Sequence, residues 1–144
     1  MSEVETVRTA MYNALGTALP TGTTIIKANS TEDFQIRLRN LNTVGVAYGG
    51  REWEPKPAAI GKKKQNSNPI YFVLYAAPGP GPGVTTGKDV FSLMEAGAAA
   101  LIGLQVLVGA QKIILLGASE ALVLENGAVG GLLYEQRWRY WKVG

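Results

Sequence analysis

The sequence predicts an α+β fold, a mostly antiparallel sheet with two main helices packed on one face. Three observations predict it: two segments have helical apolar spacing, several apolar runs resemble strands, and turn residues separate them. The 144 residues fit a single domain, 1–144, that is large enough to bury a core. Hydrophobic residues make up 47% of the chain and charged residues 17%, which excludes a disordered chain.

Residues 2–19 give the clearest helix. Ser2 and Glu5 form a capping box, in which each side chain satisfies a free backbone N–H of the first turn. Apolar residues then recur at helical spacing and form one stripe: Val4, Val7, Met11, Leu15 and Ala18. Pro20 ends the helix because its ring cannot continue the hydrogen-bond ladder.

Three strands are expected in the first half of the chain. Residues 24–28 form a short β-branched run, and residues 44–48 form a strand that ends at Gly49-Gly50. Between them, residues 30–41 begin with a helix-start signal but also alternate, so a short helix and a strand both remain open. Residues 70–76 are apolar on both faces, which predicts a central strand covered on both sides.

A second helix is predicted after the proline- and glycine-rich loop at residues 78–83. Thr86 and Asp89 form its expected capping pair, and Gly103 is its expected end. Residues 83–89 resemble a phosphate-binding loop between strand and helix. The spacing between the glycines does not fit a P-loop, so we expect a plain helix-entry loop.

The C-terminal part, from about 106 to 143, predicts strands joined by a tight turn at residues 125–127. In the last strand Tyr134, Trp138 and Tyr140 point one way, and Glu135, Arg137 and Arg139 point the other. Trp141 shares the face of the two arginines. We therefore expect Trp141 to be a partly exposed contact residue, with core packing of these aromatics as the alternative.

The residues needed for common catalytic chemistry are missing. The chain has no Cys and no His, which removes thiolate nucleophiles, imidazole bases and zinc-finger ligands. Its carboxylates are scattered, and Glu52 and Glu54 are flanked by basic residues. We therefore expect no enzyme activity, no catalytic residues, no metal site and no cofactor. The acidic N-terminus does not resemble a signal peptide, and no run predicts a membrane helix.

The excess positive charge lies in one segment, residues 51–64, which we expect to be an exposed loop. It holds five basic and two acidic residues, whereas the rest of the chain holds nine of each. A solvated loop, contact with an acidic partner and contact with passing DNA all remain open. Ten residues are candidates for interfaces: Arg51, Trp53, Lys56, Lys62, Lys63, Lys64, Lys88, Arg137, Arg139 and Trp141.

The chain resembles the phage Mu-like family of small tail-terminator, or tail-completion, proteins over nearly its whole length. The resemblance rests on the helix ending in Ala18-Leu19-Pro20, the 44–50 strand running into a variable loop, and Gln65 before residues 70–74. It continues in the helix that closes with residues 99–103 and in the aromatic strand 134–141. The chain departs from the family in its 78–83 loop and its triple lysine at 62–64.

The resemblance implies a tail-terminator-like fold and a virion structural role. In that role a homo-oligomeric ring, a hexamer, caps the tail tube and joins it to the neck. Its partners would be the tail tube protein, the neck or connector proteins and, in a contractile phage, the sheath. DNA would be passing cargo, with no membrane partner and with assembly in the host cytoplasm. The alternatives are another head–tail connector or neck completion subunit, or a small nucleic-acid- or ligand-binding module using the basic 51–64 loop.

Overall fold

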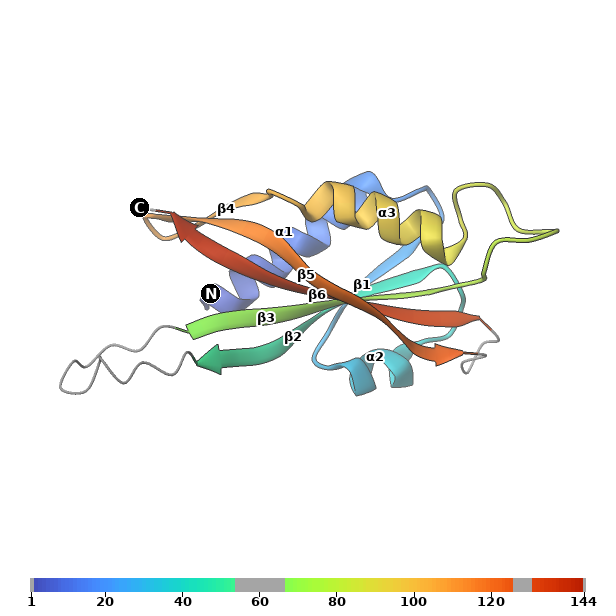
Figure 1. Ribbon diagram of the computed structural model, residues 1–144, viewed down its shortest axis with the longest axis horizontal. Coiled ribbons are helices and arrows are strands. Elements are labelled where there is room, and N and C mark those ends of the chain that lie inside the picture. Colours follow the sequence, from blue (N-terminus) through green and yellow to red (C-terminus); the bar gives the residue numbers. More distant parts are fainter. Residues whose placement is uncertain (1, 54–66, 126–130, 144) are drawn as a thin grey trace.

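The computed structural model describes residues 2–53, 67–125 and 131–143, without the side chains of residues 118 and 141–143. These residues form three helices and six strands, arranged along an elongated molecule (Figure 1). The elements in chain order are α1 (Glu3–Ala18), β1 (Thr24–Ala28), α2 (Thr31–Arg37), β2 (Thr43–Trp53), β3 (Ser67–Ala77), α3 (Val90–Leu101), β4 (Gln105–Val108), β5 (Gln111–Glu125) and β6 (Leu132–Val143).

Helix α1 confirms the first predicted helix to within one residue at each end. The Oγ of Ser2 accepts a hydrogen bond from the backbone N–H of Glu5 at 3.1 Å, which caps the first turn. Val7, Met11 and Leu15 are fully buried, so the predicted apolar stripe faces the core.

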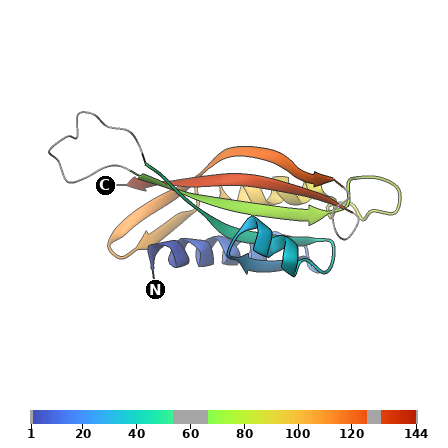
Figure 2. The ribbon, with the colours of Figure 1, turned by 90° about the horizontal axis from the view of Figure 1, so that it is seen from below.

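The strands form one sheet in the order β1-β2-β3-β6-β5-β4. The strand predicted at residues 24–28 is confirmed, and the strand predicted at 70–76 is the interior strand β3. Strands β1 and β2 pair in parallel, and the other neighbours pair antiparallel. The sheet is strongly twisted, as the crossing ribbons in Figure 2 show.

The predicted fold class, a mostly antiparallel α+β sheet with two main helices on one face, is wrong. Strands hold more of the described residues than helices do, and the sheet is mixed because β1 runs parallel to β2. A third helix, α2, also packs on the face opposite α1 and α3 (Figure 2). We call the face under α1 and α3 the inner face and the other the outer face. The error came from the segment between β1 and β2. A short helix there crosses the outer face, so that β2 runs parallel to β1 and not antiparallel to it.

Helix α2 resolves the ambiguity in residues 30–41 in favour of a helix. The Oγ of Ser30 accepts a hydrogen bond from the N–H of Asp33 at 2.9 Å, which caps the helix. Phe34 is fully buried on the outer face, with its ring directly over Gly45. A Cβ at Gly45 would lie 2.7 Å from Cε2 of the Phe34 ring and closer still to its Cδ2, so a glycine is required there for α2 to lie close to the sheet.

Strand β2 extends further than predicted. It passes through Gly49-Gly50 and continues to Trp53, with a register shift against β3 between Tyr48 and Arg51. A β-bulge accommodates the glycines without ending the strand. Arg51 and Trp53 therefore lie on a strand end, and the prediction that they belong to an exposed loop is wrong.

Only the second residue of the predicted capping pair caps helix α3. Asp89 is the N-cap, and its carboxylate accepts hydrogen bonds from the N–H of Ser92 at 3.1 Å and from its hydroxyl at 2.7 Å. Thr86 lies in the preceding turns, so its predicted role as cap is wrong. The Ser92 hydroxyl and backbone bonds lower the pKa of Asp89 below its usual value.

Replacing Asp89 with alanine is expected to lower the melting temperature at neutral pH. Because the folded-state pKa of Asp89 is depressed, its stabilising effect is present above the ordinary value of 3.8 and is lost as the pH falls below it. The difference in melting temperature between wild type and variant should therefore shrink in acid. Thermal melts over a pH series measure it, with Glu95→Ala on the exposed side of α3 as control. A difference that stays constant into strong acid would contradict the capping role.

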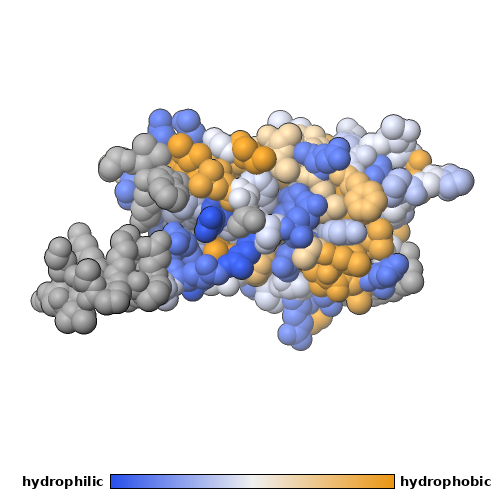
Figure 3. All heavy atoms as spheres, in the orientation of Figure 1, coloured by the Kyte–Doolittle hydropathy of each residue, from blue (hydrophilic) through white to orange (hydrophobic). Residues whose placement is uncertain are grey.

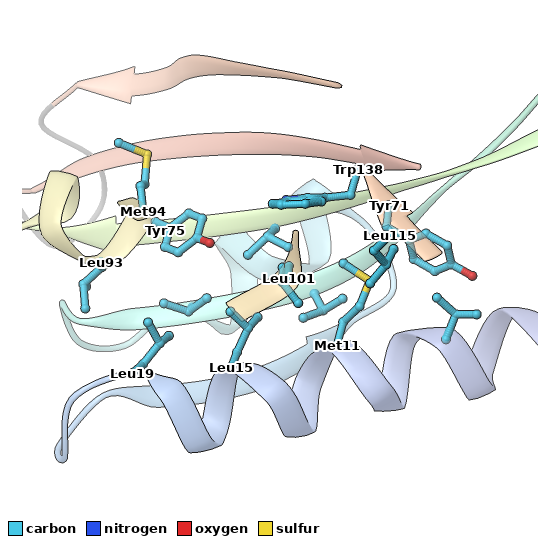
Figure 4. Close-up of a cluster of buried hydrophobic side chains, with 14 of the residues drawn as sticks. Met11, Leu15, Leu19, Tyr71, Tyr75, Leu93, Met94, Leu101, Leu115 and Trp138 are labelled. Carbon is cyan, nitrogen blue, oxygen red and sulfur yellow. The ribbon is translucent and has the colours of Figure 1, made fainter. Parts of the chain in front are cut away.

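The main core lies between the inner face and the two long helices. In Figure 4 Met11 and Leu15 of α1, and Leu19 directly after it, point toward Tyr71 and Tyr75 of β3 and toward residues of α3, β5 and β6. The smaller outer core joins α2 to the sheet through Phe34 and Leu38. Trp138 and Tyr140 are buried on the inner face, which confirms the predicted alternation of β6. This rigid sheet holds the surfaces described next.

Candidate interaction surfaces

The sequence-predicted interface residues lie at two opposite ends of the sheet. Strand β2 ends at Trp53 and β3 begins at Ser67 at one end, on the left of Figure 1. The loop that carries Lys88 projects at the other end, on the right of the same view. The structure therefore separates Lys88 from the arginines and the tryptophan of the β2 and β6 ends. Lys56, Lys62, Lys63 and Lys64 lie outside the described residues.

The side chain of Arg51 is held by contacts with other elements, whereas that of Trp53 is largely exposed. The guanidinium of Arg51 pairs with the Glu3 carboxylate of α1 at 3.3 Å and donates to the Ser67 hydroxyl at 3.0 Å. Trp53 is 58% exposed, which is unusual for so large an apolar side chain. Trp53 is thus the better contact candidate, whereas Arg51 ties the strand end to α1.

Lys88 precedes the cap of α3. Its backbone carbonyl accepts a 2.6 Å hydrogen bond from the side-chain amide of Asn42, and its side chain is partly buried. That bond fixes the end of the projecting loop to the turn before β2. The preceding residues Pro80 to Gly83 are exposed, so the loop tip and not Lys88 itself faces solvent.

Arg137 and Arg139 face outward from β6, as predicted, and lie side by side on the outer face. Arg137 forms an ion pair with Glu52 of β2, and Arg139 is exposed. A hollow of about 340 Å³ lies between them, with Glu52 of β2, Ile70 of β3 and Ser119 of β5 in its lining. We call it the arginine hollow. Trp141 lies in β6, but its side chain is outside the described part, so its predicted exposure stays a prediction.

A second hollow of about 290 Å³ lies on the inner face beside the C-terminal half of α3. Ala98 of α3 and Ile102 directly after the helix line one side, and Gly117 of β5 and Trp138 of β6 line the other. Ile102 is 63% exposed, so this apolar hollow opens to solvent. Ser119 and Arg137 line both hollows, so the two flank the same stretch of β5 on opposite faces.

Sequence reasoning missed a buried polar network under α3. The Oε1 of Gln136 accepts from the Tyr75 hydroxyl at 2.7 Å and from the Trp138 indole N–H at 3.3 Å. Its Nε2 donates to the backbone carbonyl of Met94 at 3.1 Å and to the Glu120 carboxylate at 2.8 Å. The signal was present, because Gln136 is a polar residue on the inward side of the alternating strand β6. The network fixes α3 over β5 and β6.

The charged groups with shifted pKa values have structural explanations. Burial alone would raise the pKa of Glu5, but bonds from Lys27 and Arg8 outweigh it and lower the pKa. Burial raises the pKa of Glu135, despite a hydrogen bond from the Thr31 hydroxyl. These groups join elements of the fold. Glu5 and Glu135 do not share a cavity, so they are not the pair of carboxylates with separated pKa values that acid–base catalysis uses.

No known family model and no curated protein matches this chain. The surfaces themselves therefore carry the functional argument. Among the described residues no group of three acidic side chains is placed to hold a metal ion. No described helix is long and apolar enough to cross a membrane.

Proposed function

We propose that this chain is a virion structural protein, a phage tail terminator. Its copies form a ring, a hexamer by the family resemblance, that caps the tail tube and joins it to the neck. Its partners are other copies of itself, the tail tube protein, the neck or connector proteins and, in a contractile phage, the sheath. It acts by occupying the tube end, not by chemistry, and DNA only passes through the ring.

The observation that carries the proposal is the separation of two projecting surfaces along the long axis of one rigid sheet. The loop before α3 extends beyond the sheet at one end, and the end of β2 with the exposed Trp53 lies at the other (Figure 1). A subunit that joins a tube to a neck needs two such surfaces facing opposite ways. Loops held on a rigid scaffold suit this role, because they present contact residues without disturbing the core.

The exposed apolar surface gives further support. Figure 3 shows apolar surface among the hydrophilic side chains over β5 and β6. Large apolar residues are exposed on several elements: Ile36, Trp53, Phe91, Ile102, Leu107, Leu116, Leu122, Val123 and Leu124. Single exposed apolar residues are normal, but Leu122 to Leu124 are consecutive. Consecutive exposed leucines and valines on a strand favour burial against another subunit.

Growth of tail tubes in the presence of the purified chain tests the function. Tube protein is polymerised with and without it, and tube lengths are measured by electron microscopy. We expect shorter tubes, with the chain labelling one end only. An unchanged length distribution with no end labelling would contradict the proposal.

The same experiment separates the alternatives. A neck completion subunit would bind the connector and leave tube length unchanged. A nucleic-acid-binding module would bind DNA with an affinity that falls steeply with salt. The described surface disfavours a nucleic-acid-binding module, because Arg51 and Arg137 are each paired with a carboxylate.

A further inference from the structure

Among the described residues, the outermost strand at each edge of the sheet pairs with only part of its neighbouring strand. Strand β1 pairs with residues 43–47 of β2, which leaves the outer edge of β2 from Tyr48 to Trp53 without a strand partner. Strand β4 pairs with residues 111–114 of β5, and Leu115 bonds to Gly103 and Leu104. Beyond Leu115, residues 116–125 of β5 pair only with β6. We call these two stretches the β2 step and the β5 step.

Side chains from α1 and α2 bond to backbone carbonyls at the C-terminal end of β1. A guanidinium nitrogen of Arg37 donates to the backbone carbonyl of Lys27 at 2.6 Å, and one of Arg8 donates to that of Ala28 at 2.8 Å. A carbonyl that accepts from an arginine is less accessible to an added strand, and charged side chains at a sheet edge disfavour pairing there. The β2 step lies beyond these two arginines.

The two steps are complementary in direction and position. Each neighbouring pair from β2 through β3 and β6 to β5 is antiparallel, so β2 and β5 run in opposite directions. Each step is the C-terminal part of its strand, so the two lie at opposite ends of the sheet. When the β5 step of one copy meets the β2 step of another in the same orientation, the strands are antiparallel. The β4 of one copy and the β1 of the other then lie beyond either end of the contact.

We infer that neighbouring copies of this chain join by pairing the β5 step of one with the β2 step of the next. This inference rests on the proposed ring and identifies its subunit contact. The contact uses two different surfaces, so it does not stop at a two-fold dimer, and its repetition gives a ring where the rotation between neighbours closes. The continuous sheet would be staggered from one copy to the next, as strands are in a closed barrel.

The backbone of the β5 step is oriented for this pairing. Leu115 directs its N–H and C=O away from β6, toward Leu104 and Gly103. The register pairs Leu115, Glu120 and Leu122 with the even-numbered residues of β6, so Glu120 and Leu122 also direct their backbone groups outward. Register shifts on either side limit the regular run to residues 119–122. A short regular run between bulges restricts pairing to a matching partner.

The two hollows fit the side chains of the incoming strand. Successive residues of a strand point to opposite faces, so an added strand at Ser119 sends side chains toward both hollows. On the β2 step, Glu52 faces outward, since it pairs with Arg137, and Trp53 lies on the inner side with Arg51. Trp53 of the incoming strand would enter the apolar hollow beside Ile102. Glu52 would face the exposed Arg139 of the neighbour.

Cross-linking between single-cysteine variants tests the pairing, since the chain has no cysteine of its own. Ser119→Cys and a size-tagged Glu52→Cys protein are mixed at a concentration where wild type associates, and treated with a short bismaleimide. Both positions lie on the outer face. We expect cross-links between the two proteins and none within either alone. Glu32→Cys on the exposed side of α2 is the control and should cross-link to neither.

A proline variant tests the backbone contact. Leu122→Pro removes an N–H that points away from β6, so the fold tolerates it while the added strand loses a hydrogen bond. We expect the dissociation constant measured by sedimentation to rise at least about tenfold, with a similar effect for Trp53→Ala. Ile36→Lys, on the equally exposed surface of α2, should leave it unchanged.

The outcomes separate this inference from the proposed function. Self-cross-linking of Ser119→Cys would show a two-fold β5 contact and overturn the inference. An oligomer that gives no cross-link between the two variants would also overturn it and leave the ring in place. A chain that stays monomeric at all concentrations would overturn both. Cross-linking between the two variants without any effect on tube length would support the contact and remove tail termination.

Discussion

Replacing Gly97 with alanine is expected to lower the free energy of unfolding by about 1–3 kcal/mol. Gly97 lies on the buried side of α3, and a Cβ there would lie 2.9 Å from the Cζ of Tyr75 and closer still to its hydroxyl. The Tyr75 ring is fully buried and its hydroxyl is bonded to Gln136, so it cannot move aside. Alanine would favour the helix by only about 1 kcal/mol, and the steric clash outweighs that gain.

Gly16→Ala is the matched control for this prediction. Gly16 lies in α1, and nothing lies within 4 Å of the position its Cβ would take. The same substitution should therefore raise the free energy of unfolding by up to about 1 kcal/mol. Chemical denaturation of both variants gives the comparison. Equal effects of the two substitutions would mean that α3 does not pack this closely on Tyr75.

The close approach at Gly97 also bears on the proposed contact. Ala98 of the same helix and Ile102 at its C-cap line the apolar hollow beside the β5 step. A side chain that pushes α3 away from the sheet would widen this hollow. Gly97→Ala should thus weaken association as well as stability, whereas Gly16→Ala should change stability alone.

Local patterns in the sequence predicted the elements that depend on nearby residues. The cap at Ser2 and the apolar stripe fixed α1, and the run apolar on both faces identified the interior strand β3. The alternation of β6 correctly separated buried Trp138 from exposed Arg139. Each of these signals reflects the period of a helix or strand and needs no knowledge of which element packs beside it.

The errors concern contacts between residues that are distant in the chain. Nothing near Phe34 shows that it packs on Gly45 across the outer face, so the third layer and the parallel pairing were missed. Gly49-Gly50 resembles a strand end, but pairing of Arg51 and Trp53 with β3 extends the strand through a bulge. Asp89 was recognised at the start of α3, but Thr86 was wrongly paired with it, because a threonine also fits a cap position.

The candidate interface shows the same difference between local patterns, which the sequence reveals, and long-range contacts, which it does not. Sequence alone selected Trp53, Arg137 and Arg139, because large aromatic residues and arginines dominate contact energies. It could not identify the two steps, since they arise from the unequal lengths of paired strands. Strand length depends on the partner strand, and partners are set by the tertiary fold. The steps nevertheless link these isolated residues into one contact, with Trp53 on one side and the two hollows, one of them lined by the arginines, on the other.

Replacing Gln136 with leucine is expected to lower the free energy of unfolding by about 3 kcal/mol or more. The change leaves the buried hydroxyl of Tyr75 and the indole N–H of Trp138 without their partner, and it removes the bond that the Met94 carbonyl accepts in addition to its helix bond. Each buried polar group left unsatisfied costs about 1–3 kcal/mol, while the added apolar surface restores only part of that loss. Denaturant unfolding measures the effect, with Gln105→Leu on the exposed side of β4 as control, expected within about 0.5 kcal/mol of wild type.

Adding Tyr75→Phe to Gln136→Leu tests the origin of that loss. With both partners of the 2.7 Å bond removed, the hydroxyl no longer needs a partner, so the double variant should lose less than the sum of the single variants. The Glu120 carboxylate, freed from Gln136, would stay at the β5 step with only solvent to meet it. Additive losses would mean that Tyr75 and Gln136 stabilise the fold independently, and that the network does not hold α3 over the sheet as one unit.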